Sequence, residues 1–375
     1  MNEPNRNALE GDQPSTLEPL TTEDNLIARF LTDAEERGLV GEKENAATAL
    51  LCAVSARLPR PLNLTVNGES SSGKNFLLSS ATAFIPDEHK KSTSGLTAKA
   101  LMHAREDEFQ HKAIIIAEYE GVSSADYAIR TMQSEQVIEW DYVDTGKGIK
   151  KKTNKVRGPA AFLQATTRPV LHPENETRLL FISVDESNEQ TEAILKRQAR
   201  IAAANGVVLP NEESIKDWHE FLRSLIPMNI CIPYAETLAE HFPADRVRSR
   251  RDFPKLLGLI ETLAYLHQNR RENKNNAVIA APDDYLVAKR LFENSYATGP
   301  DSKLTELLTA AQALKENSAF RASDLIEATG WGKSKVYAVL QRAEELGCIA
   351  ETETRGIYSF IRSSAVPPLK LPDEV

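Results

Sequence analysis

One short stretch restricts the fold more than any other part of the chain: Gly68-Glu69-Ser70-Ser71-Ser72-Gly73-Lys74-Asn75. An apolar run at residues 62–66 precedes it and predicts a buried strand, and the residues from Phe76 onward predict a helix. Glycines in such a turn let backbone N–H groups approach phosphate oxygens, and the helix N-terminus adds its positive dipole end. Lys74 would place a point charge on the outer phosphates. The sequence therefore predicts a nucleotide-phosphate site formed by residues 68–76.

The order strand, glycine-rich turn, lysine and helix is that of the P-loop motif. The motif normally continues with Ser or Thr, whose hydroxyl binds Mg²⁺, whereas this chain has Asn75. An amide oxygen is also a hard ligand, so Asn75 stays a candidate metal ligand. We therefore expect ATP and Mg²⁺ as cofactors. The alternative interpretation is a Gly/Ser-rich turn that contains a lysine by chance.

Composition limits the class of protein. The chain has 375 residues, which predicts about two or three domains. Its net charge of −9 argues against indiscriminate coating of nucleic acid, so any nucleic-acid surface must be local.

The three cysteines, Cys52, Cys231 and Cys348, are far apart and are expected to be buried thiols in a reducing compartment, with no zinc site. No apolar run reaches about 18 residues and no signal peptide opens the chain, so we expect a cytoplasmic protein without a membrane partner.

A second apolar run leads into acidic residues. Residues 113–116 read Ala-Ile-Ile-Ile and are followed by Ala117, Glu118, Tyr119 and Glu120. This pattern is typical of a buried parallel strand with catalytic carboxylates at its carboxyl end, and it is a candidate Walker B strand. One of Glu118 and Glu120 would hold magnesium-bound water and the other would polarise the attacking water; the assignment stays open, with Glu118 kept beside Asn75 as a candidate metal ligand. The alternative is a core strand that ends in solvated glutamates.

A basic hairpin is predicted downstream. Residues 137–143 alternate apolar and polar side chains, and residues 149–156 form the return arm after a glycine-containing turn. Five lysines lie on the turn and return arm: Lys147, Lys150, Lys151, Lys152 and Lys155. Each lysine that meets a phosphate releases a counterion, so such a hairpin suits the backbone of DNA. The alternative is a solvated hairpin of high charge.

Two further strands carry candidate site residues. Residues 158–168 predict a buried strand that ends in Thr166 and Thr167, either of which can bond a γ-phosphate or its attacking water. Arg178 stands directly before the predicted strand 179–185. An arginine in this position also suits a simple ion pair with a carboxylate.

These motifs in this order resemble an AAA+ ATPase with a hairpin inserted before sensor 1. The segment Thr177-Arg178-Leu179-Leu180-Phe181-Ile182-Ser183-Val184-Asp185-Glu186 is similar to the arginine-finger segment of minichromosome-maintenance (MCM) helicases and of the MCM-like replicative helicases of prophages and mobile elements. The resemblance implies that Thr167 or Thr166 is sensor 1. It implies that Arg178 reaches the nucleotide of a neighbouring subunit in a homo-oligomeric ring, a hexamer in the simplest case.

An arginine-rich run at residues 246–251 opens a leucine-patterned helix. It is similar to the sensor 2 helix of the MCM lid, where Arg251 fits best and Arg250 nearly as well. The alternative is the basic start of a helix with a solvated face.

The last unit starts near residue 301. Two helices, the turn at residues 330–332, a third helix at 333–346 and a small hairpin at 349–361 predict a winged helix. Lys333 and Lys335 on the third helix suit a DNA groove. Winged helices also serve as protein-contact modules, which is the alternative.

The expected fold is α/β: an AAA+ P-loop parallel sheet with a helical lid, plus a C-terminal winged-helix domain. The expected divisions are a disordered N-terminus (1–20), a helical lead-in (21–60), the ATPase core (61–190), the lid (191–300), the winged helix (301–362) and a tail (363–375). We expect an ATP-dependent DNA motor, a replicative helicase of a prophage or mobile element that acts on single-stranded or forked DNA with other replication proteins. The alternative is an ATP-switched replication initiator or helicase loader that does not unwind DNA.

Overall fold

A parallel five-stranded sheet forms the centre of the protein. The structure is a computed structural model and describes residues 18–119, 124–144, 150–167, 177–203, 212–244, 248–298, 300–314, 319–345, 348–360 and 371–373. The strand order is β2-β3-β6-β1-β7, and every neighbouring pair in it is parallel. The bounds are β1 (Leu64–Asn67), β2 (Lys90–Thr93), β3 (Lys112–Ile116), β6 (Ala160–Thr166) and β7 (Leu180–Ser183). The predicted α/β class and parallel sheet are confirmed.

Both faces of this sheet are covered, which explains why its inner strands are mostly apolar. Along β6, Ala161, Leu163 and Ala165 pack into one hydrophobic core while Ala160 and Phe162 pack into another. This alternation is the period of two that a strand imposes on its side chains. The first core contains α3 (Lys43–Val54), α4 (Lys74–Thr82) and parts of later helices; the second contains α5 (Ala98–Met102) and α6 (Asp126–Glu135). A short helix, η2 (Asp87–His89), leads into β2.

Short N-terminal helices pack against the first core. They are α1 (Glu18–Thr21), α2 (Leu26–Glu36), α3 and the short helix η1 (Ser55–Arg57). The side chain of Asn25 accepts a hydrogen bond from the N–H of Ala28 at 2.9 Å and so caps α2. Leu20 is buried, so this last piece of the segment expected to be disordered is instead part of the fold. Residues 1–17 lie outside the described residues.

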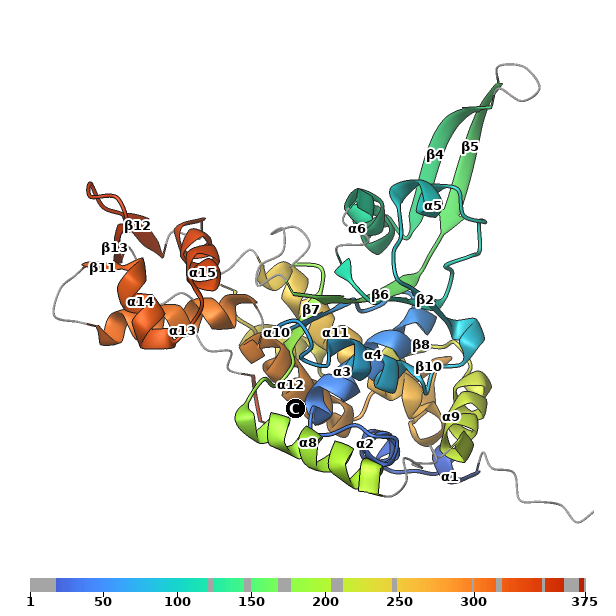
Figure 1. Cartoon of the computed structure of the whole chain (residues 1–375). Coiled ribbons are helices and arrows are strands. Elements are labelled where there is room, and N and C mark those ends of the chain that lie inside the picture. Colours follow the sequence, from blue (N-terminus) through green and yellow to red (C-terminus); the bar gives the residue numbers. More distant parts are fainter. Residues whose placement is uncertain are drawn as a thin grey trace, which may run out of the picture.

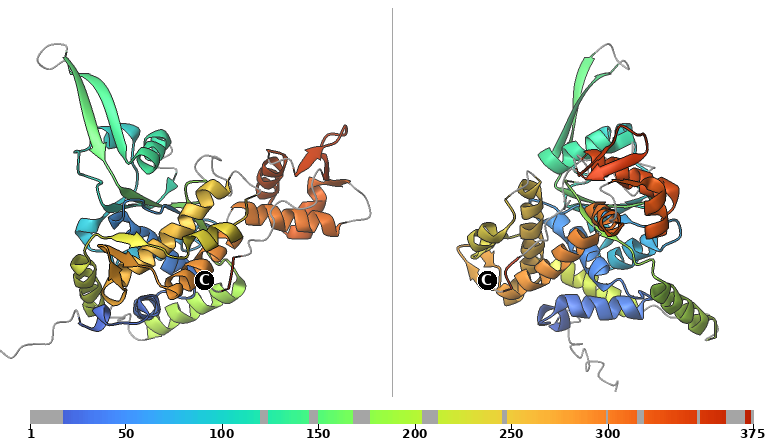
Figure 2. Two further views of the ribbon diagram at one scale, coloured as in Figure 1. Left: turned by 180° about the vertical axis from the view of Figure 1, so that it is seen from behind. Right: turned by 90° about the vertical axis from the view of Figure 1, so that its left-hand side faces the viewer.

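The predicted hairpin is present and projects from the body (Figures 1 and 2). Strand β4 (Val137–Asp144) pairs antiparallel with β5 (Lys150–Arg157), and α5 lies beside it. Ile138 and Val156 at its base are buried in the second core. Because β5 leads directly into the amino end of β6, the hairpin starts from the sheet edge opposite to the P-loop.

The segment from 186 to 298 is mostly helical, as predicted. Its elements are α8 (Asn188–Ala203), α9 (Glu212–Ser224), β8 (Asn229–Cys231), α10 (Ala235–His241), α11 (Ser249–Leu266), η4 (Gln268–Arg270), β9 (Asn273–Lys274), β10 (Ala277–Ile279) and α12 (Pro282–Thr298). The small sheet β8-β10-β9 was not anticipated, because its strands have only two or three residues. Cys231 lies on this sheet and is exposed, so the expectation that all three thiols are buried is wrong.

The C-terminal unit has its own core and lies to one side of the body (Figures 1 and 2). Its elements are α13 (Pro300–Ala313), β11 (Ala319–Arg321), α14 (Ala322–Thr329), α15 (Lys333–Glu345), β12 (Ile349–Glu351) and β13 (Ile357–Phe360), with the antiparallel sheet β11-β13-β12. The three helices and the final hairpin follow the predicted order, whereas β11 was not predicted. Past it, Leu371 is buried in the first core, and Tyr285 and Lys289 of α12 donate hydrogen bonds to the carbonyl of Pro372. This part of the expected tail is therefore docked on the body. Within the described ranges, no helix is both long and apolar enough to span a membrane.

Candidate nucleotide-binding site

The glycine-rich loop joins β1 to α4, as the sequence predicts, and two of its positions require glycine. Gly73, the N-cap of α4, has a φ of +93°, in the left-handed region that favours glycine. A Cβ atom on Gly68 would lie 2.4 Å from Cγ2 of Val184 and 2.5 Å from Oγ of Ser72. The loop is therefore held close to the chain that follows β7.

Lys74 is the first residue of α4 and is only 9% exposed. Its ammonium group donates hydrogen bonds to the carbonyl oxygens of Gly68, at 2.9 Å, and Glu69. The charge thus lies on the inner side of the loop, where phosphate oxygens would replace carbonyls as its partners. The N-terminus of α4 adds unsatisfied backbone N–H groups to the same place. These residues fit a nucleotide phosphate.

The carboxyl ends of three strands meet at the P-loop edge of the sheet. In the register, Asn67 of β1 lies beside Thr166 of β6, and Ile116 of β3 lies beside Gln164 of β6. Glu118, two residues beyond β3, is exposed at this edge; Thr166 is buried and Thr167, directly after it, is exposed. The structure thus brings the predicted acid strand and the Thr-ended strand to the P-loop. Glu120 lies outside the described residues.

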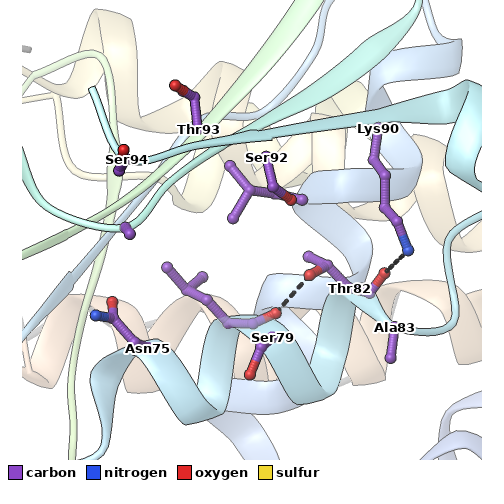
Figure 3. A pocket seen from close by; sticks show the side chains of 11 residues that line it. Asn75, Ser79, Thr82, Ala83, Lys90, Ser92, Thr93 and Ser94 are labelled. Carbon is purple, nitrogen blue, oxygen red and sulfur yellow. Dashed lines mark hydrogen bonds between the residues drawn. The ribbon is translucent and has the colours of Figure 1, made fainter. Parts of the chain in front are cut away.

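A cavity of about 570 Å³ lies between α4 and strands β2 and β3. Asn75 is at one end and Lys90 at the other (Figure 3). Ala117 also lines the cavity, whereas Glu118 is not among the described residues that line it. A Mg²⁺ ion bound to phosphates keeps several waters and needs only one or two protein oxygens. The roles of Asn75 and Glu118 as metal ligands stay predictions.

Sequence reasoning missed Glu186. Its carboxylate accepts a hydrogen bond from the N–H of Glu69, with an N···O distance of 2.5 Å, at the entrance of the P-loop. Glu186 follows β7 and so comes to the same edge as the carboxyl ends of β1 and β6. The acidic pair Asp185-Glu186 directly after a predicted strand is the signal that was available.

A second missed residue, Glu42, supports this arrangement from the N-terminal side. Its carboxylate accepts hydrogen bonds from the N–H of Asp185, at 2.6 Å, and from Nδ2 of Asn45, at 2.5 Å. Burial raises the pKa of Glu42 above its ordinary value, although both hydrogen bonds oppose the shift. Asn45 also donates to the carbonyl of Ser183 at 2.9 Å. The start of α3 therefore fixes the loop that carries Glu186.

Arg178 and Arg251 lie together, away from the P-loop. Arg178 precedes β7 and donates a hydrogen bond to the hydroxyl of Ser134 in α6. Arg251, at the start of α11, lies with Nη1 3.2 Å from Oγ1 of Thr177. An extended strand covers about 3.3 Å per residue, so Arg178 is roughly 17 Å from the other end of β7, where the P-loop lies. Neither arginine is placed at this chain's own phosphate site.

The basic residues predicted to contact DNA differ in their surroundings. Lys151 pairs with Asp141 at 2.7 Å, and Lys155 pairs with Glu139 at 2.5 Å, both across the hairpin. Hydrogen bonds from Lys151 and then Thr153 hold the pKa of Asp141 below its ordinary value. Lys147 and the side chain of Lys150 lie outside the described residues, and Lys152 is exposed.

On α15, Lys335 lies 4.7 Å from the ring centre of Trp331, and Lys333 lies 5.9 Å from that of Tyr337.

The parallel sheet, with a glycine-rich loop between β1 and the N-terminus of α4, defines a P-loop nucleotide-binding domain. Residues 12–226, more than half of the chain, match the family model described as MTBMA_p00010 P-loop domain. The chain belongs to this family. A search of curated proteins gave no match. The match covers the sheet, the hairpin, α8 and α9, and nucleotide binding follows from it.

Proposed function

We propose that this protein is a ring-forming AAA+ ATPase that moves along DNA, and that it serves as a replicative helicase of a mobile element. The observation that carries the proposal is the separation of two half-sites on one sheet. The P-loop, Glu118 and Thr167 lie at the carboxyl edge, while Arg178 lies at the amino edge. A head-to-tail ring would bring the amino edge of one copy to the carboxyl edge of the next, and such heterologous contacts close into rings.

The chemistry divides between the two copies. Lys74 and the loop N–H groups bind the phosphates, and Thr167 or Thr166 contacts the γ-phosphate. Glu118 or Glu120 orients the attacking water. Mg²⁺, when bound, neutralises charge between the β- and γ-phosphates. Arg178 of the neighbouring copy supplies positive charge to the transferred group, an effect worth roughly 10³–10⁵ in turnover for such arginines.

The hairpin supports DNA as the substrate track. Residues 137–157 contain three acidic and six basic residues, a net charge of +3 in a chain of net charge −9. The hairpin projects from the body, so its basic residues lie away from the rest of the chain (Figure 1). In the proposed ring it would extend into the pore. Its base lies beside α6, whose Ser134 holds Arg178, which links DNA contact to the trans site.

One observation favours a second candidate, an ATP-switched initiator or loader. The C-terminal unit has the helices and small antiparallel sheet typical of a winged helix, and the start of α15 carries Lys333 and Lys335 beside aromatic rings. Such a surface suits recognition of duplex DNA.

Strand displacement on a forked DNA duplex separates the two functions. The proposed helicase releases the labelled strand in the presence of ATP and Mg²⁺, and Lys74→Ala, which lacks the phosphate-binding charge, does not. Hydrolysis of ATP and binding of DNA by the wild-type chain without release of a strand would favour the initiator or loader.

A further inference from the structure

The two faces of the β4–β5 hairpin have different chemistry. Trp140 pairs with Asn154 and Tyr142 with Lys152 in the antiparallel register. Because successive side chains of a strand point to opposite faces, these four residues share one face, continuous with buried Ile138 and Val156. We call this the aromatic face. The opposite, ion-pair face carries five charged residues: Glu139, Asp141, Lys151, Lys155 and, at the base of the hairpin, Arg157, which pairs with Glu106.

The basic side chains on the ion-pair face already have carboxylate partners. Asp141 pairs with Lys151 at 2.7 Å and accepts a hydrogen bond from Thr153 at 2.6 Å. Glu139 pairs with Lys155 at 2.5 Å. A phosphate that approached either lysine would also meet the neighbouring carboxylate. The ion-pair face therefore stabilises the hairpin more than it attracts an anion.

The aromatic face is open to solvent beyond its buried base. Nδ2 of Asn154 donates hydrogen bonds to the carbonyls of Met102, at 2.6 Å, and Ala104, at 3.1 Å, which fixes this face beside α5. Farther out, the ring of Tyr142 meets that of His103 edge to face, with a centroid separation of 5.5 Å. Trp140 is 41% exposed, and Lys152 lies opposite Tyr142. Three rings and one cation thus lie on the same face of the projecting part of the molecule.

We propose that the aromatic face binds single-stranded DNA, with Trp140 as the stacking platform for a base and Lys152 at the adjacent phosphate. The proposal rests on the DNA-motor function and names the residues that hold its substrate. Exposed aromatic side chains next to a cation are the recurring elements of single-strand binding, since every base offers a π face regardless of sequence. Duplex DNA has its bases stacked internally and cannot use this platform.

Affinity for an oligothymidylate, measured with the full chain, is the first test. Trp140→Ala is expected to weaken binding about tenfold, the loss typical of one stacked base. The matched control is Tyr127→Ala, which removes an aromatic ring that is 70% exposed on α6, and it is expected to bind as wild type. The double variant Lys151→Ala with Asp141→Ala removes an ion pair without changing net charge and is also expected to bind as wild type.

Quenching of tryptophan fluorescence by bound DNA reports on Trp140 itself, so it distinguishes direct contact from a loss of affinity caused by misfolding. The chain has three tryptophans; Trp218 is buried in the first core, and Trp331 lies on the C-terminal unit. In a Trp331→Phe background, oligothymidylate is expected to quench the emission of Trp140. Trp140→Phe in that background is expected to abolish the quenching while it retains most of the affinity, because Phe also stacks.

Four results would overturn the proposal. Wild-type affinity in Trp140→Ala would exclude the platform, and weaker binding by the ion-pair double variant would move the contact to the other face; both leave the DNA-motor function standing. Quenching by oligouridylate but not oligothymidylate would exclude DNA as the ligand. Absence of any DNA binding by the wild-type chain would refute the DNA-motor function as well.

Discussion

Replacing Glu186 with Gln is expected to tighten nucleotide binding. The Glu186 carboxylate accepts the N–H of Glu69 at the loop entrance, so a negative charge already lies beside the loop that receives the phosphates. Gln keeps an oxygen acceptor for that N–H and removes the charge. The shape of the loop is therefore retained while the repulsion between this side chain and a bound nucleotide disappears.

The size of the expected gain in nucleotide affinity follows from the exposure of Glu186. Two like charges 4 Å apart repel by about 1 kcal/mol in water and about 4 kcal/mol near a protein surface of lower dielectric. Glu186 is exposed, which favours the lower figure, but a nucleotide carries several charges. A gain of about 1–2 kcal/mol corresponds to roughly 5- to 30-fold tighter binding.

Equilibrium titration with a fluorescent ATP analogue measures this gain. The matched control is Glu189→Gln, which removes an exposed acid from the first turn of α8 and is expected to change affinity little. The difference between the two variants should shrink at high salt, because screening weakens the repulsion. Weaker binding by Glu186→Gln, or an equal gain in Glu189→Gln, would refute the reasoning.

Three further outcomes are expected. Lys74→Ala abolishes ATP turnover, measured as phosphate release, while its thermal midpoint stays close to wild type, because the ammonium group bonds to carbonyls of the same loop. Gly68→Ala lowers both the thermal midpoint and nucleotide affinity, because its Cβ would collide with Val184 at 2.4 Å. Lys152→Ala flattens the salt dependence of single-strand binding by about 0.7, because one phosphate is no longer neutralised; an unchanged slope would exclude Lys152 as a DNA ligand.

Local chemistry explains what the sequence could predict. Binding of a phosphate accounts for both the glycines and the lysine of the Gly68–Asn75 loop, and the apolar residues of 62–66 and 113–116 predict the buried strands on the same sheet. The hairpin was predictable from the alternation in residues 137–143 and the glycine-containing turn that follows them, and the order of the three helices and the last hairpin of the C-terminal unit was predictable as well. In each case the determining residues are neighbours in the chain.

Contacts between distant segments were not predictable. Leu20 lies in a mostly polar stretch of the sequence and Leu371 in a proline-rich one, and their burial depends on surfaces formed by helices far away in the chain. Pairing of Lys151 with Asp141 required the register of the hairpin. Glu186 reaches the P-loop only because β7 lies next to β1. Sequence reasoning identified the loop but not the acid beside it.

The turnover of mixed subunits tests the central claim, a site shared between neighbouring copies, most directly. Arg178→Ala subunits keep an intact P-loop, and Lys74→Ala subunits keep an intact Arg178, so each variant alone is expected to hydrolyse ATP slowly. In an equal mixture about a quarter of the ring interfaces would combine the intact loop with the intact arginine. We predict that turnover rises well above that of either variant and is greatest near equal proportions. Mixed rings that form, by native mass, yet show no rise at any ratio would contradict the shared site.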